Sequence, residues 1–312
     1  MSICIPTYNR KERLIAQLES ICSQPRAKEI PIIISDNHSS YSVADEVAPL
    51  FEGRLNLRVF RFGANTSMLV NLCSGFLYSQ TEWVWMLGDD DRTAPDSIAK
   101  ILADVESAPE DVSLIKYSLE GEFFPAHEDE CVYSFPQFID QYRRLLKASP
   151  KRKVEIAGSC AFISAYVFRP RLMEKYLHTS FFYGYNHLAF FAPSLFAFKD
   201  GIGMRFSSSR IVRYIQPEEG KHWPVEKYFL GLCSWRDMPI RAEERDKKWF
   251  VVFMANMFTP KTVLKMLVAD RTLTRGYKAY VFGKILRECY CYSLPTRLKF
   301  MARFWRKELS AC

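Results

Sequence analysis

Closely spaced cysteine pairs are missing from this 312-residue chain, although it contains nine cysteines. No Cys-x-x-Cys occurs, and the closest pair is the Cys-x-Cys of Cys289 and Cys291. The N-terminus also lacks a basic and apolar leader, because residues 2–5 already have the pattern of a strand, so we expect no cleavable secretory signal. Together these absences argue against a disulfide framework and predict free thiols in a reducing compartment.

Long apolar runs are equally scarce. Residues 181–198 are almost entirely apolar or aromatic, but they include Asn186, His187 and Pro193 and are barely long enough to cross a bilayer. Residues 249–258 are apolar and too short to span. We therefore predict a buried core segment with a polar pocket at 181–198, and no transmembrane helix.

The overall composition is that of a globular protein. Hydrophobic residues make up 48% of the chain and charged residues 25%, which excludes extensive disorder. Aromatic residues reach 15%, enough for a large core and for aromatic groups on the surface. The formal net charge is +8, and the basic excess is concentrated after Arg241. Such an uneven excess points to an anionic partner: a membrane surface, a nucleic acid or a phosphorylated substrate.

Strand-like and helix-like segments alternate in the first third of the chain. The expected strands are 2–5, 31–35, 55–60 and 83–87, and the expected helices are 11–22, 43–51 and 68–78. A run of three isoleucines at 32–34 fits a strand that is buried on both faces, as in a parallel sheet. The repeated strand–helix order predicts an α/β fold with a Rossmann-like, doubly wound and mostly parallel sheet flanked by helices.

Three adjacent carboxylates, Asp89, Asp90 and Asp91, follow Gly88 at the carboxyl end of the fourth expected strand. Ligands of open α/β sheets bind at this edge. Hard divalent cations take oxygen ligands and leave positions for substrate phosphates. One hypothesis is therefore a site for a metal-bound diphosphate. The alternative is a solvated acidic turn that caps a helix starting near Pro95.

Two more polar turns meet the same edge of the expected sheet. Residues 7–10 follow the first strand, and residues 36–40 follow the second. An aspartate after the second strand, here Asp36, is well placed to hold a ribose hydroxyl or a base imide. Taken singly, Asp36 fits an ordinary turn residue, but capping alone does not explain three polar turns at one edge.

These turns carry a resemblance to a known family. Ile5-Pro-Thr-Tyr-Asn-Arg10, Ile34-Ser-Asp-Asn37 and Leu87-Gly-Asp-Asp-Asp91 resemble the three N-terminal signatures of the family 2 glycosyltransferases, which have a GT-A fold. The third signature is also similar to that of abequosyltransferase-like enzymes of bacterial O-antigen and capsule assembly. The resemblance covers residues 1–105 and implies an inverting transfer of a sugar from a nucleotide-diphosphate donor, with Mn²⁺ or Mg²⁺.

The resemblance also implies roles for individual residues. The nucleotide-sugar donor would contact Pro6, Thr7, Tyr8, Arg10, Asp36, Asp89 and Asp90. Asp36 would meet the base, while Asp89 and Asp91 would form the Asp-x-Asp pair, with Asp91 as the direct metal ligand and a catalytic residue. Relatives often have Asn-x-Gly after the third strand where this chain has Asn65-Thr-Ser67, so the positioning of the donor there stays open.

The second half of the chain is expected to build the acceptor side. The expected elements are a strand at 114–117 and a helix at 136–146. By the resemblance, residues 156–163 would form a strand beside the acceptor, where Gly158 and Ser159 would allow a close approach. The basic segment 147–153 is either a solvated loop or a contact for a phosphorylated acceptor.

Inversion needs a base that takes the proton of the acceptor hydroxyl. Relatives commonly use an aspartate of a Glu-Asp pair, whereas residues 183–188 of this chain contain no carboxylate. His187 is the candidate base, because imidazole titrates near neutral pH; a hydrogen-bonded core histidine is the equal alternative. Asp200 is the nearest downstream carboxylate and also fits a simple turn, and a missing base would fit a different stereochemical course.

A late strand is expected at 210–215, and a loop follows it. GT-A enzymes often place a histidine in this loop, where it closes on the metal and the diphosphate. His222 is that candidate ligand here, Lys221 would meet phosphate charge, and Trp223 would cover the pocket. The alternative is a surface loop without a role in binding.

Helical patterns dominate the C-terminal region, and its last segments mix cations with large apolar side chains. Residues 296–309 place Arg297, Lys299, Arg303, Arg306 and Lys307 among Leu298, Phe300, Met301, Phe304 and Trp305. This pattern is typical of a helix that lies on an anionic membrane surface, which suits a lipid-linked acceptor. The alternative is a helical subdomain with an ordinary solvated basic face.

The sequence thus predicts a GT-A domain at 1–225, with a nucleotide-sugar half (1–105) and an acceptor half (106–225), and a helical, basic region at 226–312. The expected activity is metal-dependent glycosyl transfer to a saccharide or lipid-linked oligosaccharide in bacterial O-antigen or capsule assembly. We expect a cytoplasmic protein, peripheral at the inner face of the cytoplasmic membrane.

Two other functions stay open. A nucleotidyltransferase shares the sheet and the acidic pair, but residues 6–11 lack the glycines of a phosphate loop. A non-catalytic nucleotide-binding or scaffold subunit of a polysaccharide complex fits the missing Glu-Asp pair. No nucleic-acid partner is expected. The basic tail would suit a nucleic acid, but the acidic triplet would repel it.

Overall fold

The computed structural model describes residues 1–183, 190, 192–213 and 225–310. Within these ranges nine strands form one sheet in the order β3-β2-β1-β4-β8-β6-β9-β5, with β7 paired to β9. The strands are β1 (Ser2–Thr7), β2 (Pro31–Asp36), β3 (Asn56–Arg61), β4 (Val84–Met86), β5 (Arg92–Thr93), β6 (Val112–Glu120), β7 (Glu130–Val132), β8 (Tyr166–Phe168) and β9 (Gly203–Arg213).

The N-terminal part of the sheet is parallel, as the sequence predicts. β1 lies between β2 and β4 and runs parallel to both, and β3 is parallel to β2. The three isoleucines of β2, Ile32, Ile33 and Ile34, are buried, because helices cover both faces of this strand. Antiparallel pairings enter only with β8, β7 and β5, on the other side of β4.

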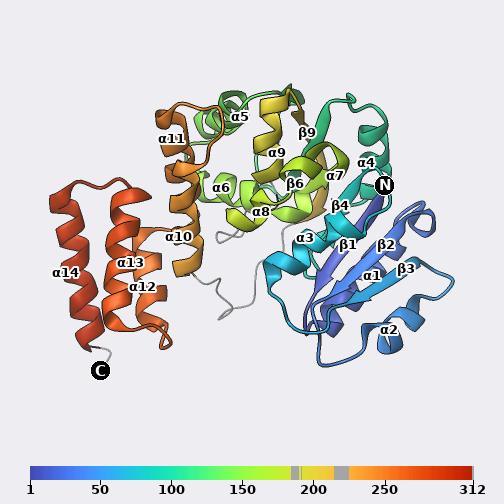
Figure 1. Ribbon diagram of the computed structural model, residues 1–312, viewed down its shortest axis with the longest axis horizontal. Helices are drawn as coiled ribbons and strands as arrows, with labels where there is room; N and C mark the ends of the chain where they lie inside the picture. Colours follow the sequence, from blue (N-terminus) through green and yellow to red (C-terminus); the bar gives the residue numbers. More distant parts are fainter. Residues whose placement is uncertain (184–189, 191, 214–224, 311–312) are drawn as a thin grey trace.

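Helices cover both faces of the sheet (Figure 1). The α-helices are α1 (Lys11–Cys22), α2 (Val43–Glu46), α3 (Met68–Tyr78), α4 (Ser97–Glu106), α5 (Phe135–Ala148), α6 (Lys153–Ala161), α7 (Pro170–Met173), α8 (Thr179–Phe182), α9 (Ala192–Ala197), α10 (Val225–Ser234), α11 (Glu244–Ala255), α12 (Pro260–Ala269), α13 (Arg275–Glu288) and α14 (Leu294–Ser310). One hydrophobic cluster joins α1 and α4 to the sheet, and a larger one joins α3, α5 and α6.

The second half departs from the sequence-based expectation at one element. Helix α5 and strand β6 form where they are predicted, and the α5 N-cap Ser134 accepts the Gln137 backbone N–H. The strand expected at 156–163 is wrong, because residues 153–161 are helix α6. Ile156, Ala157, Cys160 and Ala161 are buried along one face of that helix, which is a helical spacing.

The apolar segment 181–198 is only partly buried. Helix α9 lies in the core as predicted. Phe181 and Phe182 are instead 49% and 74% exposed, so the prediction of a buried core segment is wrong at these two residues. No single described helix is long and apolar enough to span a membrane, although α11 and α12, bent by 62° at the break between them, meet the length and composition criteria as a pair.

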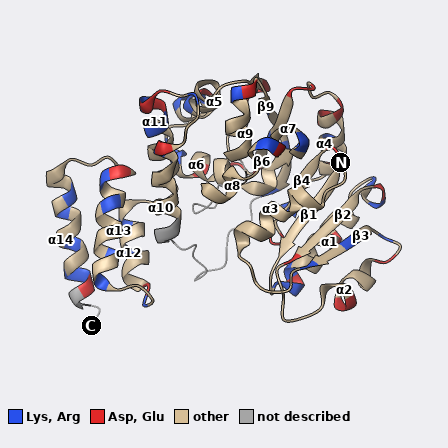
Figure 2. Cartoon of the chain, in the orientation of Figure 1, with Lys and Arg blue, Asp and Glu red and all other residues tan. Residues whose placement is uncertain are grey.

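The C-terminal helices α12, α13 and α14 lie side by side at one end of the molecule, away from β1–β3 (Figure 1). Helix α10 links them to the rest of the chain through contacts with α11 and α13. Their buried side chains, including Phe282 and Phe304, belong to the same hydrophobic cluster as α5 and α6. The residues after 225 therefore share a core with α5 and α6. Lys and Arg residues recur along α14 (Figure 2).

The eight cysteines within the described ranges form no disulfide. Most of them are buried in apolar surroundings. The closest pair joins α10 to α13, where the sulfur atoms of Cys233 and Cys289 lie 3.5 Å apart.

Ser67, the N-cap residue of α3, has a strained backbone at the position where relatives often have glycine. Ser67 has φ 148° and ψ 163°, a conformation that is essentially restricted to glycine and costs another residue of order 1–3 kcal/mol. Its hydroxyl accepts the Val70 N–H at 3.3 Å, and Ser→Gly at an N-cap loses only a few tenths of a kcal/mol. We expect Ser67→Gly to raise the free energy of unfolding by about 1 kcal/mol in urea denaturation.

Ser42→Gly is the matched control for this prediction. Ser42 caps α2 in the same way, with its hydroxyl accepting the Asp45 N–H at 3.2 Å, but its φ of −91° is unstrained. That variant is expected to be slightly less stable than the wild type, because glycine adds entropy to the unfolded chain. Equal destabilisation of both variants would contradict the strain at Ser67.

Candidate active site

The carboxyl ends of β1, β2 and β4 bring the three polar turns together. Thr7 and Asp36 are register partners at the ends of β1 and β2. The Thr7 hydroxyl donates a 2.8 Å hydrogen bond to Oδ2 of Asp89, which lies three residues after the end of β4. Parallel strands end at one edge of a sheet, so three turns that are far apart in sequence meet there.

Arg10 balances part of the negative charge of the acidic triplet. Its guanidinium donates to Oδ1 of Asp89 and to Oδ2 of Asp90, both at 2.8 Å. Arg13 approaches Oδ2 of Asp90 at 3.4 Å. Asp89 is buried while Arg10 is about half exposed, so the pair joins the interior to the open edge of the site.

Asp91 is held by different partners. Ser164, in the short 3-10 helix Ile163–Ala165, donates its hydroxyl to Oδ2 of Asp91 and accepts the Gly88 backbone N–H at 2.8 Å. A Cβ atom at Gly88 would lie 2.7 Å from Oδ2 of Asp91, so only glycine permits this close approach. The chain thus turns tightly around a carboxylate that is 8% exposed.

Burial dominates the electrostatics of the triplet. It raises the pKa of Asp91 to about 7, and the neighbouring charges of Asp90 and Asp89 add to this effect while the Ser164 hydrogen bond opposes it. Burial also raises the pKa of Asp89, and the Arg10 charge acts in the opposite direction. The ionised forms are therefore costly, and a divalent cation at this edge would lower that cost.

Asp36 has its own set of partners and is fully buried. Its Oδ1 accepts the Ser39 backbone N–H at 2.9 Å, and its Oδ2 pairs with Arg61 at 3.1 Å. Arg61 also donates to the carbonyl oxygens of Tyr41 and Ser39, both at 2.6 Å. This carboxylate is therefore fixed in direction at the end of β2.

The loop after β3 is tied to the same edge. The Asn37 side chain donates to Oδ1 of Asn65 at 2.9 Å, and its own carbonyl accepts the Thr66 N–H and hydroxyl, both at 2.9 Å. The Asn37 N–H donates to the carbonyl of Thr7. The Asn65-Thr66 segment, where this chain departs from its relatives, is thus anchored beside Thr7.

Pro6 and Tyr8 flank Thr7 with different exposures. Pro6 is half-buried within β1, while Tyr8 is 41% exposed at the edge of the sheet. Asn9 then links the first turn to the second, because its N–H donates to the Ser39 hydroxyl and its Oδ1 accepts the Ser40 N–H. Of the predicted donor contacts, Tyr8 and Arg10 thus offer the most accessible side chains.

The described residues by themselves form no cluster of metal ligands. Within residues 1–183, 190, 192–213 and 225–310, no group of three or more His, Cys, Asp or Glu side chains is arranged to hold a metal ion. Mg²⁺ is commonly bound by only one or two carboxylates, with waters and substrate phosphates completing the shell. Asp91 and Asp89 fit this mode of binding, in which two carboxylates and a substrate diphosphate share the cation.

Four other sequence-based candidates are His187, Asp200, Lys221 and His222. His187, Lys221 and His222 lie outside the described residues, and their roles remain predictions. Asp200 ends the short 3-10 helix Phe198–Asp200 at the surface, where Lys175 lies at 3.1 Å and the Tyr176 hydroxyl donates to it at 3.0 Å.

The capping alternative for the acidic triplet is not supported. The N-cap of α4 is Asp96, not a member of the triplet, and α4 begins six residues after Asp91 at Ser97. Asp89 and Asp91 instead point their oxygens at Thr7, Arg10 and Ser164.

Two residues of the site, Arg61 and Ser164, lie outside the three sequence motifs. Ser164 lies 73 residues after Asp91, and no local pattern marks it as a partner of that carboxylate. Arg61 is different, because it ends β3 as Asp36 ends β2 and the two are register partners. Counting residues from strand to strand would have found Arg61, whereas Ser164 required the tertiary structure.

Comparison with known families agrees with this geometry. The model of the family described as "Glycosyl transferase family 2" matches residues 2–171, more than half of the chain. The chain belongs to glycosyl transferase family 2. The match includes β1 to β4, all three turns of the site and Ser164.

Curated relatives match over about a third of this chain. Abequosyltransferase RfbV of Salmonella typhimurium is 34% identical over 102 residues, which are 32% of this chain and 30% of the relative. An uncharacterized glycosyltransferase of Haemophilus influenzae is 31% identical over 109 residues, 35% of each chain. The matched region spans about a third of the length of these relatives.

Solved structures extend the likeness of the fold to the whole chain. TarS of S. aureus, solved as residues 1–349 with UDP-GlcNAc, has a TM-score of 0.57 at 11% identity, covering 99% of this chain and 88% of TarS. The mannosyltransferase PcManGT of Pyrobaculum calidifontis, with GDP-Man and Mn²⁺, has a TM-score of 0.52 at 13% identity, covering 99% and 86%. The predicted GT-A fold is thereby confirmed.

Proposed function

We propose that this family member transfers a sugar from a nucleotide-diphosphate donor to a saccharide acceptor, with Mn²⁺ or Mg²⁺ bound beside Asp91. The observation that carries the proposal is the buried Asp91 carboxylate at the carboxyl edge of a parallel sheet, where its pKa rises to about 7. Ionisation of this carboxylate costs free energy in the free protein. A dication that binds there together with a diphosphate would offset that cost.

The residues of the site divide the work of donor binding. Asp36, held by Arg61 and Ser39, would accept from the base or the ribose. Thr7 keeps Asp89 oriented, and Ser164 keeps Asp91 oriented. Arg10 is exposed enough to leave the carboxylates and meet a phosphate, because its guanidinium matches phosphate geometry.

The transfer itself forms a bond between an acceptor oxygen and the anomeric carbon and breaks the bond from that carbon to the diphosphate oxygen. When bound, the metal would neutralise the charge that develops on the leaving nucleoside diphosphate. The protein holds the donor in one orientation, with its anomeric carbon aligned to the acceptor oxygen. For the acceptor proton we propose His187 as the base, in an inverting course, with Lys221 and His222 closing on the diphosphate.

The acceptor side of the proposal concerns surface polysaccharides. RfbV is named as an abequosyltransferase, and TarS and PcManGT were solved with UDP-GlcNAc and GDP-Man. These relatives support a nucleotide-sugar donor for this chain. A lipid-linked acceptor of O-antigen or capsule assembly, and a peripheral position at the inner face of the cytoplasmic membrane, are suggested by the basic and apolar surface of α14.

The donor is tested by thermal unfolding of the full chain with UDP-, GDP-, CDP- and dTDP-sugars, each with and without Mn²⁺. A ligand at a hundred times its dissociation constant should stabilise the folded state by about 2.7 kcal/mol. We expect one base to give this shift and only with metal, and we expect release of the matching nucleoside diphosphate when acceptor saccharides are added. A proton NMR spectrum of the product would then report inversion.

The same experiment separates this proposal from its rivals. A shift without turnover for any acceptor would favour a nucleotide-binding scaffold subunit. Release of pyrophosphate from nucleoside triphosphates would favour a nucleotidyltransferase. If the well-folded chain shows no thermal shift with any nucleotide, the proposed donor site is wrong.

A further inference from the structure

Two thiols face each other where α10 packs against α13. The sulfur atoms of Cys233 and Cys289 lie 3.5 Å apart, although the two residues are 56 positions apart in the sequence. Cys289 is fully buried and Cys233 is 7% exposed. The S–S bond of a disulfide is about 2.0 Å long, so the two sulfur atoms need to approach by only about 1.5 Å to form one.

The C-terminal part of α13 places charged groups around Cys233. Lys284 and Arg287 lie 3.2 Å and 2.7 Å from the carboxylate of Glu288, so two cations share one acidic partner. Burial works against the charge of Lys284, but the hydrogen bond to Glu288 and the negative charges of Glu288 and Cys233 raise its pKa. This attraction is mutual, so Lys284 favours a negative charge on the Cys233 sulfur. Cysteines that react with oxidants lie beside cations and are partly accessible, whereas other buried thiols are inert.

Cys289 has the opposite properties. The hydrogen bond with Cys233, followed by burial, raises the pKa of the Cys289 thiol well above its usual range. Cys289 therefore keeps its proton in the unmodified protein and can donate it toward the Cys233 sulfur. A protonated and enclosed thiol does not meet an oxidant first, but it lies in position to attack Cys233 once that sulfur is oxidised.

We propose that Cys233 and Cys289 form a modification site at which a small hydroperoxide, such as hydrogen peroxide, converts the two thiols into a disulfide. The Cys233 thiolate attacks one oxygen of the peroxide, the O–O bond breaks and hydroxide leaves, so that Cys233 becomes a sulfenic acid. The Cys289 sulfur then attacks the Cys233 sulfur and displaces the hydroxyl group, which takes the Cys289 proton and leaves as water. In all, two thiols lose two electrons, and one hydrogen peroxide is reduced to two water molecules.

The size of the oxidant follows from the burial of Cys233. A nearly buried thiol can be reached by a molecule with two heavy atoms, whereas a tripeptide disulfide such as oxidised glutathione needs a wider approach. The exposed Cys291 is open to larger oxidants, and its sulfur lies 3.6 Å from the carbonyl oxygen of Glu288. The disulfide would join α10 covalently to the C-terminal helices, whether or not the protein transfers sugars.

The test is treatment of the reduced full chain with hydrogen peroxide, followed by alkylation and peptide mass spectrometry without reductant. We expect peptides joined through Cys233 and Cys289 in most chains, and we expect dithiothreitol to separate them. Cys289→Ser should instead leave Cys233 as a sulfenic acid that dimedone traps, while Cys233→Ser should leave Cys289 unmodified. The cross-linked wild type should unfold at a temperature higher by on the order of 5 °C, because a disulfide restricts the unfolded chain.

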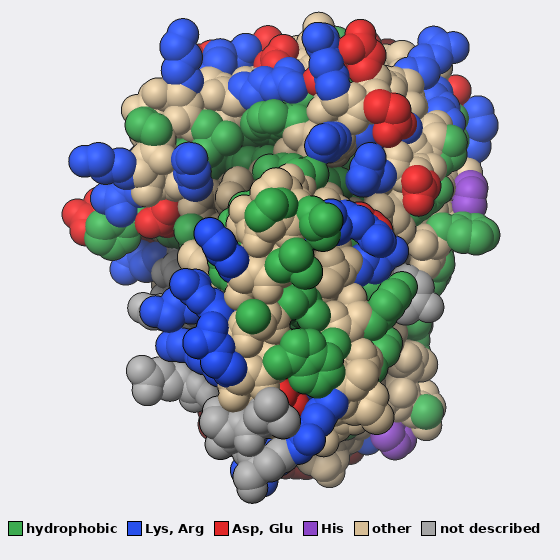
Figure 3. All heavy atoms as spheres, turned by 90° about the vertical axis from the view of Figure 1, so that its left-hand side faces the viewer, with side chains coloured by type: hydrophobic (Ala, Val, Ile, Leu, Met, Phe, Trp, Pro, Cys, Tyr) green, Lys and Arg blue, Asp and Glu red, His purple; other side chains and the backbone are tan. Residues whose placement is uncertain are grey.

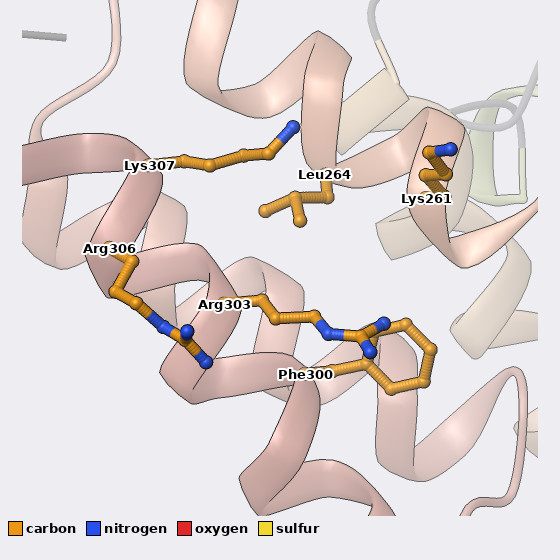
Figure 4. A pocket seen from close by; sticks show the side chains of 6 residues that line it. All are labelled: Lys261, Leu264, Phe300, Arg303, Arg306 and Lys307. Atoms are coloured by element: carbon orange, nitrogen blue, oxygen red, sulfur yellow. The ribbon is translucent and has the colours of Figure 1, made fainter. Parts of the chain in front are cut away.

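A matched pair of charge variants tests the role of Lys284. Lys284→Gln should slow cross-linking about threefold, because the loss of a nearby cation reduces the thiolate fraction of Cys233. Arg303→Gln removes the same charge from α14, at the end of the molecule where Lys and Arg side chains border exposed hydrophobic ones (Figure 3). Arg303 lines a hollow of about 260 Å³ between α12 and α14, and no cysteine is among the residues that line it (Figure 4). This control should leave the rate of cross-linking unchanged.

Five outcomes would overturn the proposal. Absence of the cross-link under conditions that oxidise Cys291 would show that the buried pair is inert. Loss of the cross-link in Cys291→Ser would make Cys291 the first thiol to react. Equal cross-linking by oxidised glutathione would assign the site to thiol–disulfide exchange. Equal slowing in Lys284→Gln and Arg303→Gln would show an effect of net charge, and a cross-linked chain that unfolds at a lower temperature would place the disulfide outside the native fold.

Discussion

The Asp91→Asn variant is expected to lose sugar transfer while gaining stability. The amide cannot supply the anionic ligand, and the loss of several kcal/mol of charge stabilisation at the leaving diphosphate predicts a decrease in kcat on the order of 1000-fold. The amide oxygen remains able to accept the Ser164 hydroxyl, so the local geometry should persist. The measurement is nucleoside diphosphate release under saturating donor and Mn²⁺.

The gain in stability follows from the raised pKa of Asp91. This acid is easier to protonate when folded, so its contribution to stability is present at low pH and is lost as pH rises from its ordinary value near 4 toward about 7. Relative to the wild type without ligands, the variant should therefore gain about 3 kcal/mol between pH 5 and pH 8. Urea denaturation at both pH values measures this difference.

Asp90→Asn serves as the comparison variant. Asp90 carries the same charge one position earlier, but its side chain is 39% exposed and ion-paired with Arg10. It should lose less than about tenfold in transfer and change the free energy of unfolding by less than about 1 kcal/mol, because exposed ion pairs contribute little. Full activity in Asp91→Asn, or an equal loss in both variants, would refute the proposed role of Asp91.

A second large effect is expected at Lys116, in the middle of β6. This side chain is buried, and its Nζ atom has no hydrogen-bond partner within the described ranges. Nζ lies 4.5 Å from the centroid of the Tyr166 ring, a cation–π contact. Burial lowers the pKa of Lys116 to about 7, so the fold holds this lysine at the expense of its charge.

Lys116→Met should therefore stabilise the chain by on the order of 4 kcal/mol at pH 7, because methionine fills a similar volume without a charge to desolvate. The raised or lowered stability of the wild type at each pH follows from the two pKa values of Lys116. The unfolded chain binds the proton up to about pH 10.5 and the folded chain only to about pH 7, so wild-type stability rises between these values. The advantage of the variant should accordingly shrink toward pH 10 in urea denaturation.

Lys151→Met provides the control, since Lys151 is exposed. Surface substitutions of this kind usually change stability by less than about 0.5 kcal/mol. A Lys116→Met variant that is destabilised at every pH would mean that the lysine has a stabilising role that outweighs its desolvation. A gain that does not change between pH 7 and pH 10 would locate the effect in packing rather than in charge.

The N-terminal fold and the position of the acidic cluster followed from the sequence to a large extent. The alternation of strands and helices predicts β1 to β4, and the polar turns at their carboxyl ends predict that Thr7, Asp36 and Asp89 meet. These features rest on local patterns and on a general property of parallel sheets. The pairing of Arg61 with Asp36 was within reach by the same counting of strand ends.

One error comes from the resemblance and the other from composition. Residues 156–163 were expected as a strand from the resemblance alone, although Ile156, Ala157, Cys160 and Ala161 have the spacing of a helix face. Phe181 and Phe182 were expected in the core because they are aromatic, yet they are exposed. Composition does not say on which side of a short helix such residues lie.

By itself, the sequence determined the alternation of elements, the parallel sheet and the carboxylates at its edge, because periodicity and motif spacing are properties of neighbouring residues. Only the tertiary structure decided that Ser164 meets Asp91, that the carboxylate is buried, and that Lys116 has no hydrogen-bond partner for its Nζ atom. It also decided that the thiols of Cys233 and Cys289 meet between α10 and α13. These properties depend on desolvation and charge proximity, which are set by segments that are distant in sequence.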